Sequence, residues 1–344
     1  MKNTFLGFSI AILLSTLFIS CEKQNIVESI EVKPMLVRSD EYFANLRAYK
    51  KSKHQVFFGW FGGTGIPGDP NIAGVFDNIP DSVDIVSLWG GYPPPGSYNA
   101  QTLQKNRTEK GTRFVWCMFG SGVSKLMKKN TPDLVPADKS KWNKDDVFKA
   151  IDLVAKAMAD TIAKHGLDGF DLDYEPGEAA EVIEVFGADP FGSDAGGKIS
   201  VQYLFKALSK YMGPQSGTRN LLIIDGYNEK GTAPYIDYLV QQAYYSSSQA
   251  NLQSRYMNFG FSGALPPEKF IPAEDFEANW KTGGVNFTDP ILGTIPSLIG
   301  FARWNPTQGQ KGGAGAYHAE YEYGSTPDFK YVRQAIQIMN PAVK

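Results

Sequence analysis

The stretch HGLDGFDLDYEP, residues 165–176, carries more information than any other part of this sequence. Side chains alternate between the two faces of a β-strand, so the apolar residues of the stretch project to one side and the acids to the other. The acids that share a face are Asp171, Asp173 and Glu175. Pro176 cannot continue a strand and therefore places Glu175 at the strand's end. The pattern predicts a buried strand that carries an acidic row to its carboxyl end.

Similar runs of apolar, β-branched and aromatic residues recur on both sides of this strand. We expect strands at 55–61, 83–89, 113–119, 169–175, 221–227, 238–245, 270–276 and 313–318. The run at 270–276 is the weakest, because prolines break up the region 258–298. Helical spacing of apolar residues lies between the strands, at 145–165, 201–212 and 329–339. This alternation favours an α/β fold, a (β/α)8 TIM barrel, with a doubly wound open sheet as the alternative.

The acidic row predicts a catalytic centre, since barrel enzymes keep their chemistry at the carboxyl ends of the strands. Like charges a few Å apart cannot all stay ionised, so we expect at least one of these carboxyl groups to hold a proton near neutral pH. A group of this kind suits general acid catalysis. A solvated edge strand and a calcium site are the alternatives. The interleaved apolar residues favour burial over both, and the stretch has no EF-hand-like loop.

The spacing Asp168-x-x-Asp171-x-Asp173-x-Glu175 resembles the DxxDxDxE signature of glycoside hydrolase family 18. That resemblance implies a (β/α)8 barrel with the signature on its fourth strand, and the stretch falls on the fourth strand expected here. It also implies substrate-assisted hydrolysis, in which the sugar's own 2-acetamido group replaces an enzyme carboxylate as the nucleophile.

The resemblance also assigns roles to the acids. Glu175 is the implied general acid, which protonates the leaving oxygen and later serves as the base toward water. Asp173 is implied to hold the acetamide N–H and to stabilise the oxazolinium ion, and Asp171 to hydrogen-bond Asp173. Asp168 opens the signature, and we count it among the candidate substrate-binding residues.

Five further residues are candidates for substrate binding. Gln242 and Tyr244 share one face of the sixth expected strand, where family members carry a tyrosine that donates to the acetamide oxygen. The tyrosine after it is the alternative if the strand register slips. Tyr317, on the last strand, stands where family 18 enzymes often have a tryptophan floor beneath the sugar. Trp60 and Trp89 end the first two strands and are candidates either for sugar stacking or for the core.

Three functions within the family fit these residues. Only 36 residues separate 276 and 313, which leaves little room for the small α+β domain that many processive chitinases insert before the last strand. This favours an endo-β-N-acetylglucosaminidase that cleaves the β-1,4 linkage in the N,N'-diacetylchitobiose core of N-glycans. A chitinase is the alternative enzyme. A barrel that binds glycans without cleaving them is disfavoured, because such proteins usually lack the terminal acid of the signature, and Glu175 is present.

Composition excludes several other classes of protein. The 34 basic and 36 acidic side chains give a net charge of −2, which predicts no nucleic acid partner. Two cysteines and three scattered histidines argue against a disulfide scaffold or a zinc centre. The GxGxxG pattern at 63–68 is followed by prolines where a dinucleotide-binding helix would begin. We therefore expect no metal and no cofactor, and a monomer.

The N-terminus has the pattern of an export signal. A lysine precedes an apolar run that is short for a membrane-spanning helix, and Phe18-Ile19-Ser20-Cys21 resembles the bacterial lipobox. We expect a lipoprotein signal peptide at 1–20, lipidation of Cys21, a tether at 21–53 and the barrel at 54–344. An ordinary signal peptide is the alternative. A lipid anchor would hold the protein on the bacterial cell envelope, at the outer membrane and exposed at the cell surface.

Overall fold

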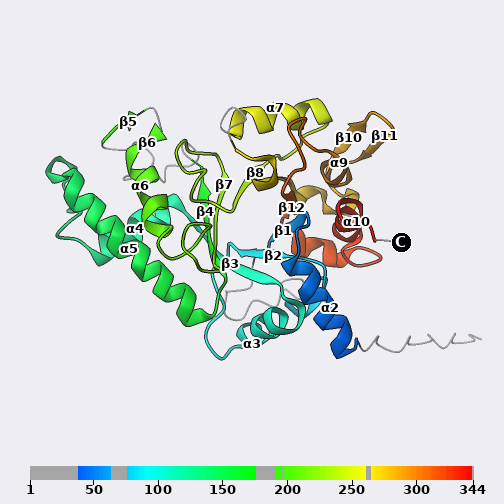
Figure 1. Cartoon of the computed structure of the whole chain (residues 1–344), viewed down its shortest axis with the longest axis horizontal. Coiled ribbons are helices and arrows are strands. Elements are labelled where there is room, and N and C mark those ends of the chain that lie inside the picture. The colour runs from blue at the N-terminus through cyan, green and yellow to red at the C-terminus, as the bar shows by residue number, and fades with distance from the viewer. Residues whose placement is uncertain (1–37, 63–75, 176–190, 195–196, 261–264, 343–344) are drawn as a thin grey trace, which may run out of the picture. The chain divides into compact units, whose positions relative to one another are not determined.

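Eight parallel strands close into a barrel, with the last strand paired to the first (Figure 1). In barrel order the strands are β1 Val56–Trp60, β2 Ile85–Leu88, β3 Arg113–Phe119, β4 Gly169–Tyr174, β7 Leu221–Gly226, β8 Tyr238–Gln242, β9 Phe270–Asp275 and β12 Gly313–Tyr317. Each of them overlaps a strand expected from the sequence. The predicted (β/α)8 barrel is therefore confirmed, and the open sheet is excluded.

The computed structural model describes residues 38–62, 76–175, 191–194, 197–260 and 265–342. Several predictions lie outside these ranges: the signal peptide, Cys21, the first part of the tether, the glycine-rich pattern at 63–68 and the strand end at Pro176. In the described part of the chain, no helix combines the length and the apolar character needed to cross a membrane.

Helices flank the barrel, and two small hairpins are added to it. The helices are α2 Asp40–Lys51, α3 Tyr98–Lys105, α4 Gly120–Asn130, α5 Lys144–His165, α6 Ile199–Leu208, α7 Gln249–Phe259, α8 Phe276–Asn279, α9 Ser297–Arg303 and α10 Lys330–Met339. The hairpins are β5 Ser193–Asp194 with β6 Gly197–Lys198, and β10 Asn286–Asp289 with β11 Gly293–Pro296. Between β9 and β12, the fully described residues 276–312 thus hold two α-helices, a short 3-10 helix and a hairpin, and no α+β domain.

The prolines that obscured the seventh strand mostly mark its surroundings. Pro267 begins a short 3-10 helix that leads into β9, and Pro290 lies in the turn between β10 and β11. Only Pro272 lies within β9, where it is aligned with Gln241 of β8. The strand predicted at 270–276 is therefore present, because the breaks fall mainly at its ends.

Two apolar layers hold the barrel together. Inward-facing side chains such as Phe58, Val115 and Ile223 fill the interior of the barrel. The outward-facing residues of the same strands pack with the helices in a larger cluster that includes Phe170, Leu172 and Tyr174 of β4. The alternation of β4 thus separates its apolar residues, which contact the helices, from its acids, which face the interior.

Backbone geometry at the start of β4 requires a glycine. Gly169 has a φ of 148°, and a Cβ atom there would lie 2.1 Å from the carbonyl oxygen of Leu221 on β7. Any side chain would therefore push β4 and β7 apart. The preceding helix α5 ends at His165, as predicted, and Gly166 caps it in the left-handed conformation.

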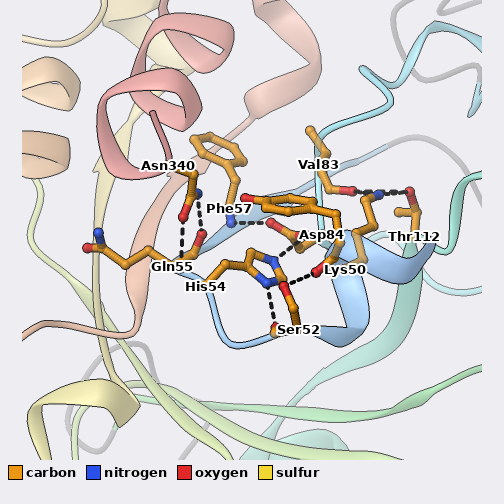
Figure 2. A network of polar contacts seen from close by, with 10 residues as sticks. Lys50, Ser52, His54, Gln55, Phe57, Val83, Asp84, Thr112 and Asn340 are labelled. Carbon is orange, nitrogen blue, oxygen red and sulfur yellow. Dashed lines mark hydrogen bonds and ion pairs between the residues drawn. The ribbon is translucent and has the colours of Figure 1, made fainter. Parts of the chain in front are cut away.

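Residues at the N-terminal ends of the strands form a polar network (Figure 2). Lys50 of α2 donates to the carbonyl oxygen of Val83 at 2.5 Å and to Thr112 Oγ1 at 2.9 Å. Burial lowers the pKa of Lys50 to about 8. Gln55 and Asn340 exchange two hydrogen bonds, of 3.1 and 2.8 Å, which join the first strand to the end of the last helix.

The position of α2 corrects one boundary. The sequence places 21–53 in a tether, yet Asp40 begins a helix that belongs to the same compact unit as the barrel. Phe43, Leu46 and Tyr49 of α2 lie at helical spacing, but none of its residues is buried and charged residues surround them, so the segment resembles a polar linker in sequence. Its long side chains, above all Lys50, attach it to the barrel through hydrogen bonds instead.

Candidate active site

The acidic row of β4 rises through the interior of the barrel to its carboxyl end. Asp171 is fully buried and accepts a hydrogen bond of 2.6 Å from Ser87 of β2. Asp173 and Glu175, the next acids along the strand, are partly accessible and line a cavity of about 220 Å³. The prediction that the three acids share an inward face is therefore confirmed.

The same cavity brings together the aromatic and amide residues expected to bind substrate. Its wall contains Trp60, Trp89, Gln242, Tyr244 and Tyr317. The ring of Tyr317 lies 5.7 Å from that of Trp89 and 6.1 Å from that of Tyr244, between ring centroids. Three residues of β3 that were not predicted complete the wall: Cys117, Met118 and Phe119. Aromatic walls around a few polar groups are typical of sugar-binding sites.

The register at the end of β8 decides between two neighbouring tyrosines. Tyr244 lines the cavity. Tyr245 adopts a left-handed conformation, with a φ of 60°, and its hydroxyl donates to Asp275 at 2.5 Å. Tyr245 is 55% exposed and does not line the cavity. The geometry therefore places Tyr244 facing the acids, as expected from the alternation of Gln242 and Tyr244.

Gln242 connects the outermost acid to a fourth carboxyl group. Its Nε2 atom donates to Glu175 Oε1 at 2.7 Å and to Asp225 Oδ1 at 3.2 Å. Asp225 ends the apolar run of β7 and is fully buried beside Asp171 and Asp173. Asp225 was not among the predicted site residues, although an aspartate at the carboxyl end of a buried barrel strand is a usable signal.

The inner carboxyl groups are arranged to hold protons. Burial, followed by the charges of Glu175 and Asp171, raises the pKa of Asp173 to about 8. Burial also raises the pKa of Asp171 to about 6 and that of Asp225 well above its ordinary value. One oxygen of each of these three aspartates is buried without another donor, so protons shared between the carboxyl groups can satisfy them. The pKa of Asp173, about 8, agrees with the expectation that at least one carboxyl group of the row holds a proton near neutral pH.

A metal site is a poor match for these groups. Single atoms of Cys117, Asp173 and Asp225 lie within 4.8 Å of one another. Burial raises the pKa of the Cys117 thiol well above its ordinary value, and both aspartates are raised as well. Metal ligands must be deprotonated, and a raised pKa disfavours the deprotonated form of each of these groups. Their arrangement suits hydrogen bonding.

Asp168 is wrong as a substrate-binding residue. It precedes β4 at the N-terminal end of the barrel, where the Arg107 guanidinium donates two hydrogen bonds, of 2.6 and 2.7 Å, to its carboxylate. The same carboxylate accepts the backbone N–H of Phe114 at 2.9 Å. Seven residues of extended chain, roughly 20 Å, separate it from Glu175. Its place in the signature is therefore structural, because it joins β3 and β4 at the end opposite the cavity.

A closed parallel barrel that carries an acidic row and an aromatic cavity at its carboxyl rim is the architecture of a barrel glycosidase. The chain belongs to glycoside hydrolase family 18, since the sequence model of the BT1044-like group of that family matches residues 20–338. It is therefore a glycoside hydrolase.

Individual relatives agree with this assignment. Endo-beta-N-acetylglucosaminidase F2 of Elizabethkingia meningoseptica is 27% identical over 374 residues, which cover 97% of this chain and 99% of that protein. The solved structure of BT1044 has a TM-score of 0.68 at 26% identity and covers 88% of this chain and 93% of its own. An endo-beta-N-acetylglucosaminidase of Cordyceps militaris shares the fold, with a TM-score of 0.63 at 23% identity over 89% of this chain and 97% of its own. The chain is thus similar to endo-β-N-acetylglucosaminidases.

Proposed function

We propose that this protein is a retaining endo-β-N-acetylglucosaminidase that cleaves the β-1,4 linkage in the N,N'-diacetylchitobiose core of N-glycans. The observation that carries the proposal is the cavity in which Glu175, Asp173 and Tyr244 converge. Similarity to an endo-β-N-acetylglucosaminidase along almost the whole chain supports the substrate class.

The reaction proceeds in two steps. Glu175 donates its proton to the glycosidic oxygen while the carbonyl oxygen of the 2-acetamido group bonds to C1, and the bond from C1 to the leaving sugar breaks. The resulting oxazolinium ion donates its N–H to Asp173. Ionised Glu175 then takes a proton from water, whose oxygen attacks C1 and reopens the ring. Two inversions at C1 leave the configuration retained. The bound acetamide supplies a nucleophile that is already in place.

Coupling between the two outer acids suits both steps. Ionised Glu175 is one of the charges that raise the pKa of Asp173. Asp173 therefore ionises more readily while Glu175 still holds the proton that it must donate. Asp171 and Ser87 fix the inner end of the row, and the Tyr244 hydroxyl donates to the acetamide oxygen.

The products of one assay test the function. The protein is incubated with a high-mannose N-glycoprotein, a complex N-glycoprotein and chitin oligomers, and the products are analysed by mass spectrometry. We expect free glycans and a single GlcNAc left on asparagine. Chitobiose released from chitin, with the glycoproteins intact, would identify a chitinase instead. Binding to glycans without release of product would identify a glycan-binding protein.

Glu175→Gln removes the proton donor and keeps the hydrogen bond from Gln242. We expect kcat to fall by about 100- to 10,000-fold, the usual contribution of a general acid, while glycan affinity is retained. Steady-state rates and isothermal titration calorimetry measure the two effects. A variant that turns over at nearly the normal rate would show that the acid has been misassigned.

For the location of the enzyme, we propose a lipid anchor on Cys21 that holds it at the bacterial outer membrane, exposed at the cell surface. The apolar run before the Phe18-Ile19-Ser20-Cys21 tetrad supports this proposal. A surface position would bring the enzyme to glycoproteins outside the cell, and we propose that it works there as a monomer.

A further inference from the structure

A second cavity adjoins the first across the proposed acid. Its volume is about 350 Å³, and Glu175, Gln242 and Tyr244 line both cavities. Its remaining wall comes from Gly226, Tyr227, Gln241, Arg255 and Phe259. None of these five residues was expected to bind substrate. The second cavity therefore extends the site over the carboxyl ends of β7 and β8 toward helix α7.

Arg255 of α7 is half-buried in this wall, and none of the carboxylates in the described part of the chain lies within ion-pair distance of it. Its side-chain hydrogen bonds go to neutral oxygens of Gln241, Gln242 and Tyr244, and all of them are long, between 3.3 and 3.4 Å. Its buried Nε atom has no acceptor among the residues that the structure describes. Elsewhere in the described chain, Arg107, Arg303 and Arg333 pair with aspartates. Arg255 thus keeps N–H donors that a ligand can use.

The rest of the wall has the chemistry of a sugar site. Tyr227 is 40% exposed, and its ring meets that of Phe259 edge-on at 5.7 Å. An exposed aromatic ring offers a surface for the C–H face of a sugar, while a guanidinium binds its oxygens. At Gly226 the lack of a side chain keeps the space open, because a Cβ atom there would lie 3.3 Å from Glu175 Cγ.

We propose that the second cavity binds the leaving hexosamine and that Arg255 positions it by donating to its hydroxyl or acetamide oxygens. This inference rests on the proposed function. The sugar that supplies the acetamide must lie in the first cavity, beside Asp173. Glu175 protonates the oxygen between the two sugars, and it lies in the wall of both cavities. The leaving sugar therefore occupies the far side of Glu175, where Arg255 and Tyr227 lie.

A preformed glycan oxazoline, used as the substrate, distinguishes the contributions of the two cavities to the reaction. Its hydrolysis uses only the first cavity, because no leaving sugar is present. Its transfer to a GlcNAc acceptor also needs the second cavity. The test compares wild type, Arg255→Met, Tyr227→Ala and a control, Arg333→Met, whose arginine pairs with Asp328. The rates measured are glycoprotein cleavage, oxazoline hydrolysis and oxazoline transfer.

We expect Arg255→Met to lower kcat/KM for the glycoprotein and the transfer rate by about 10- to 100-fold, the effect of losing a charged hydrogen bond. Most of the loss should appear in KM, and oxazoline hydrolysis should change less than about twofold by the same reasoning. Tyr227→Ala, which removes an exposed ring, should also lower the rates of glycoprotein cleavage and oxazoline transfer. It provides the test if Arg255→Met does not fold. The control should match the wild type.

The experiment distinguishes a failure of the second-cavity assignment from a failure of the proposed function. Equal losses in hydrolysis and transfer, or wild-type transfer by both cavity variants, would overturn the assignment of the second cavity while leaving the proposed function intact. A wild-type enzyme that neither hydrolyses nor transfers the oxazoline would overturn the proposed function, and the second-cavity assignment with it.

Discussion

At the scale of single residues, the site contains two kinds of residue: some could be predicted from the spacing of the sequence, and others could not. Asp173, Glu175, Gln242 and Tyr244 were predictable because strand alternation and the signature spacing place them on inward faces. The acid of β7 and the arginine of α7 were missed, since each is a single polar residue without a repeat. Only the fold shows that both lie beside Glu175.

Asp173 connects the chemistry of the site to the stability of the protein. Its pKa, raised from 3.8 to about 8, means that the folded protein keeps a proton that the unfolded chain loses. The unfolded state binds fewer protons between about pH 4 and pH 8, so the contribution of this residue to the free energy of unfolding falls as pH rises through that window.

Asp173→Asn removes this titration. We expect the variant to be nearly inactive, yet to melt at a higher temperature than wild type at pH 8, with about 2 °C gained for each kcal/mol. The difference in melting temperature should shrink steadily toward pH 4, because Asp173 is then protonated in the folded state and close to half protonated in the unfolded chain. Differential scanning calorimetry between pH 4 and pH 8 measures the difference. A constant or opposite offset would contradict the raised pKa.

At the scale of elements, prediction succeeded where burial imposes a pattern. The barrel strands are apolar because they are covered on both faces, so each was visible as a short run. Helix α2 has no buried residue and its few apolar residues lie among charged ones, so its periodic pattern is weak. The strands of the two hairpins span only two to four residues, too few for a pattern to be recognised. The two ends of strand β4 have different roles. The acids at its carboxyl end line the cavity, whereas Asp168, just before its first residue, binds Arg107.

Asp168→Asn tests the structural role of the residue that precedes β4. The amide cannot accept both hydrogen bonds from Arg107 as a charge pair, so we expect the free energy of unfolding to fall by about 1–3 kcal/mol. Activity per folded molecule should remain that of the wild type. Urea denaturation and initial rates measure the two quantities, with Asp160→Asn, in an exposed helical ion pair, as the control. A lower kcat at full stability would return Asp168 to the substrate site.

At the scale of the whole molecule, the barrel divides the functions between its two ends. Both cavities open at the carboxyl ends of the strands, whereas α2 and the network around Lys50 lie at the other end. Along the sequence, the segment that carries the proposed anchor precedes α2.

Cys21→Ser tests the proposed anchor. We expect the wild type in the membrane fraction, labelled by a fatty acid, and the variant in the soluble envelope fraction without label. Cleavage of a soluble glycoprotein should proceed at the same rate in both, because Cys21 lies outside the barrel unit. An unchanged distribution between the fractions would refute lipidation at this residue.

Closure of the barrel also constrains biosynthesis. Val56 pairs with Gly313, and Gln55 with Asn340, so the opening strand finds one of its two neighbours only after nearly the entire polypeptide has left the ribosome. Until then its unpaired edge is available to other chains, which makes the nascent protein a natural client for holding chaperones. The same delay would keep the chain unfolded for longer, which suits the export that we propose for it.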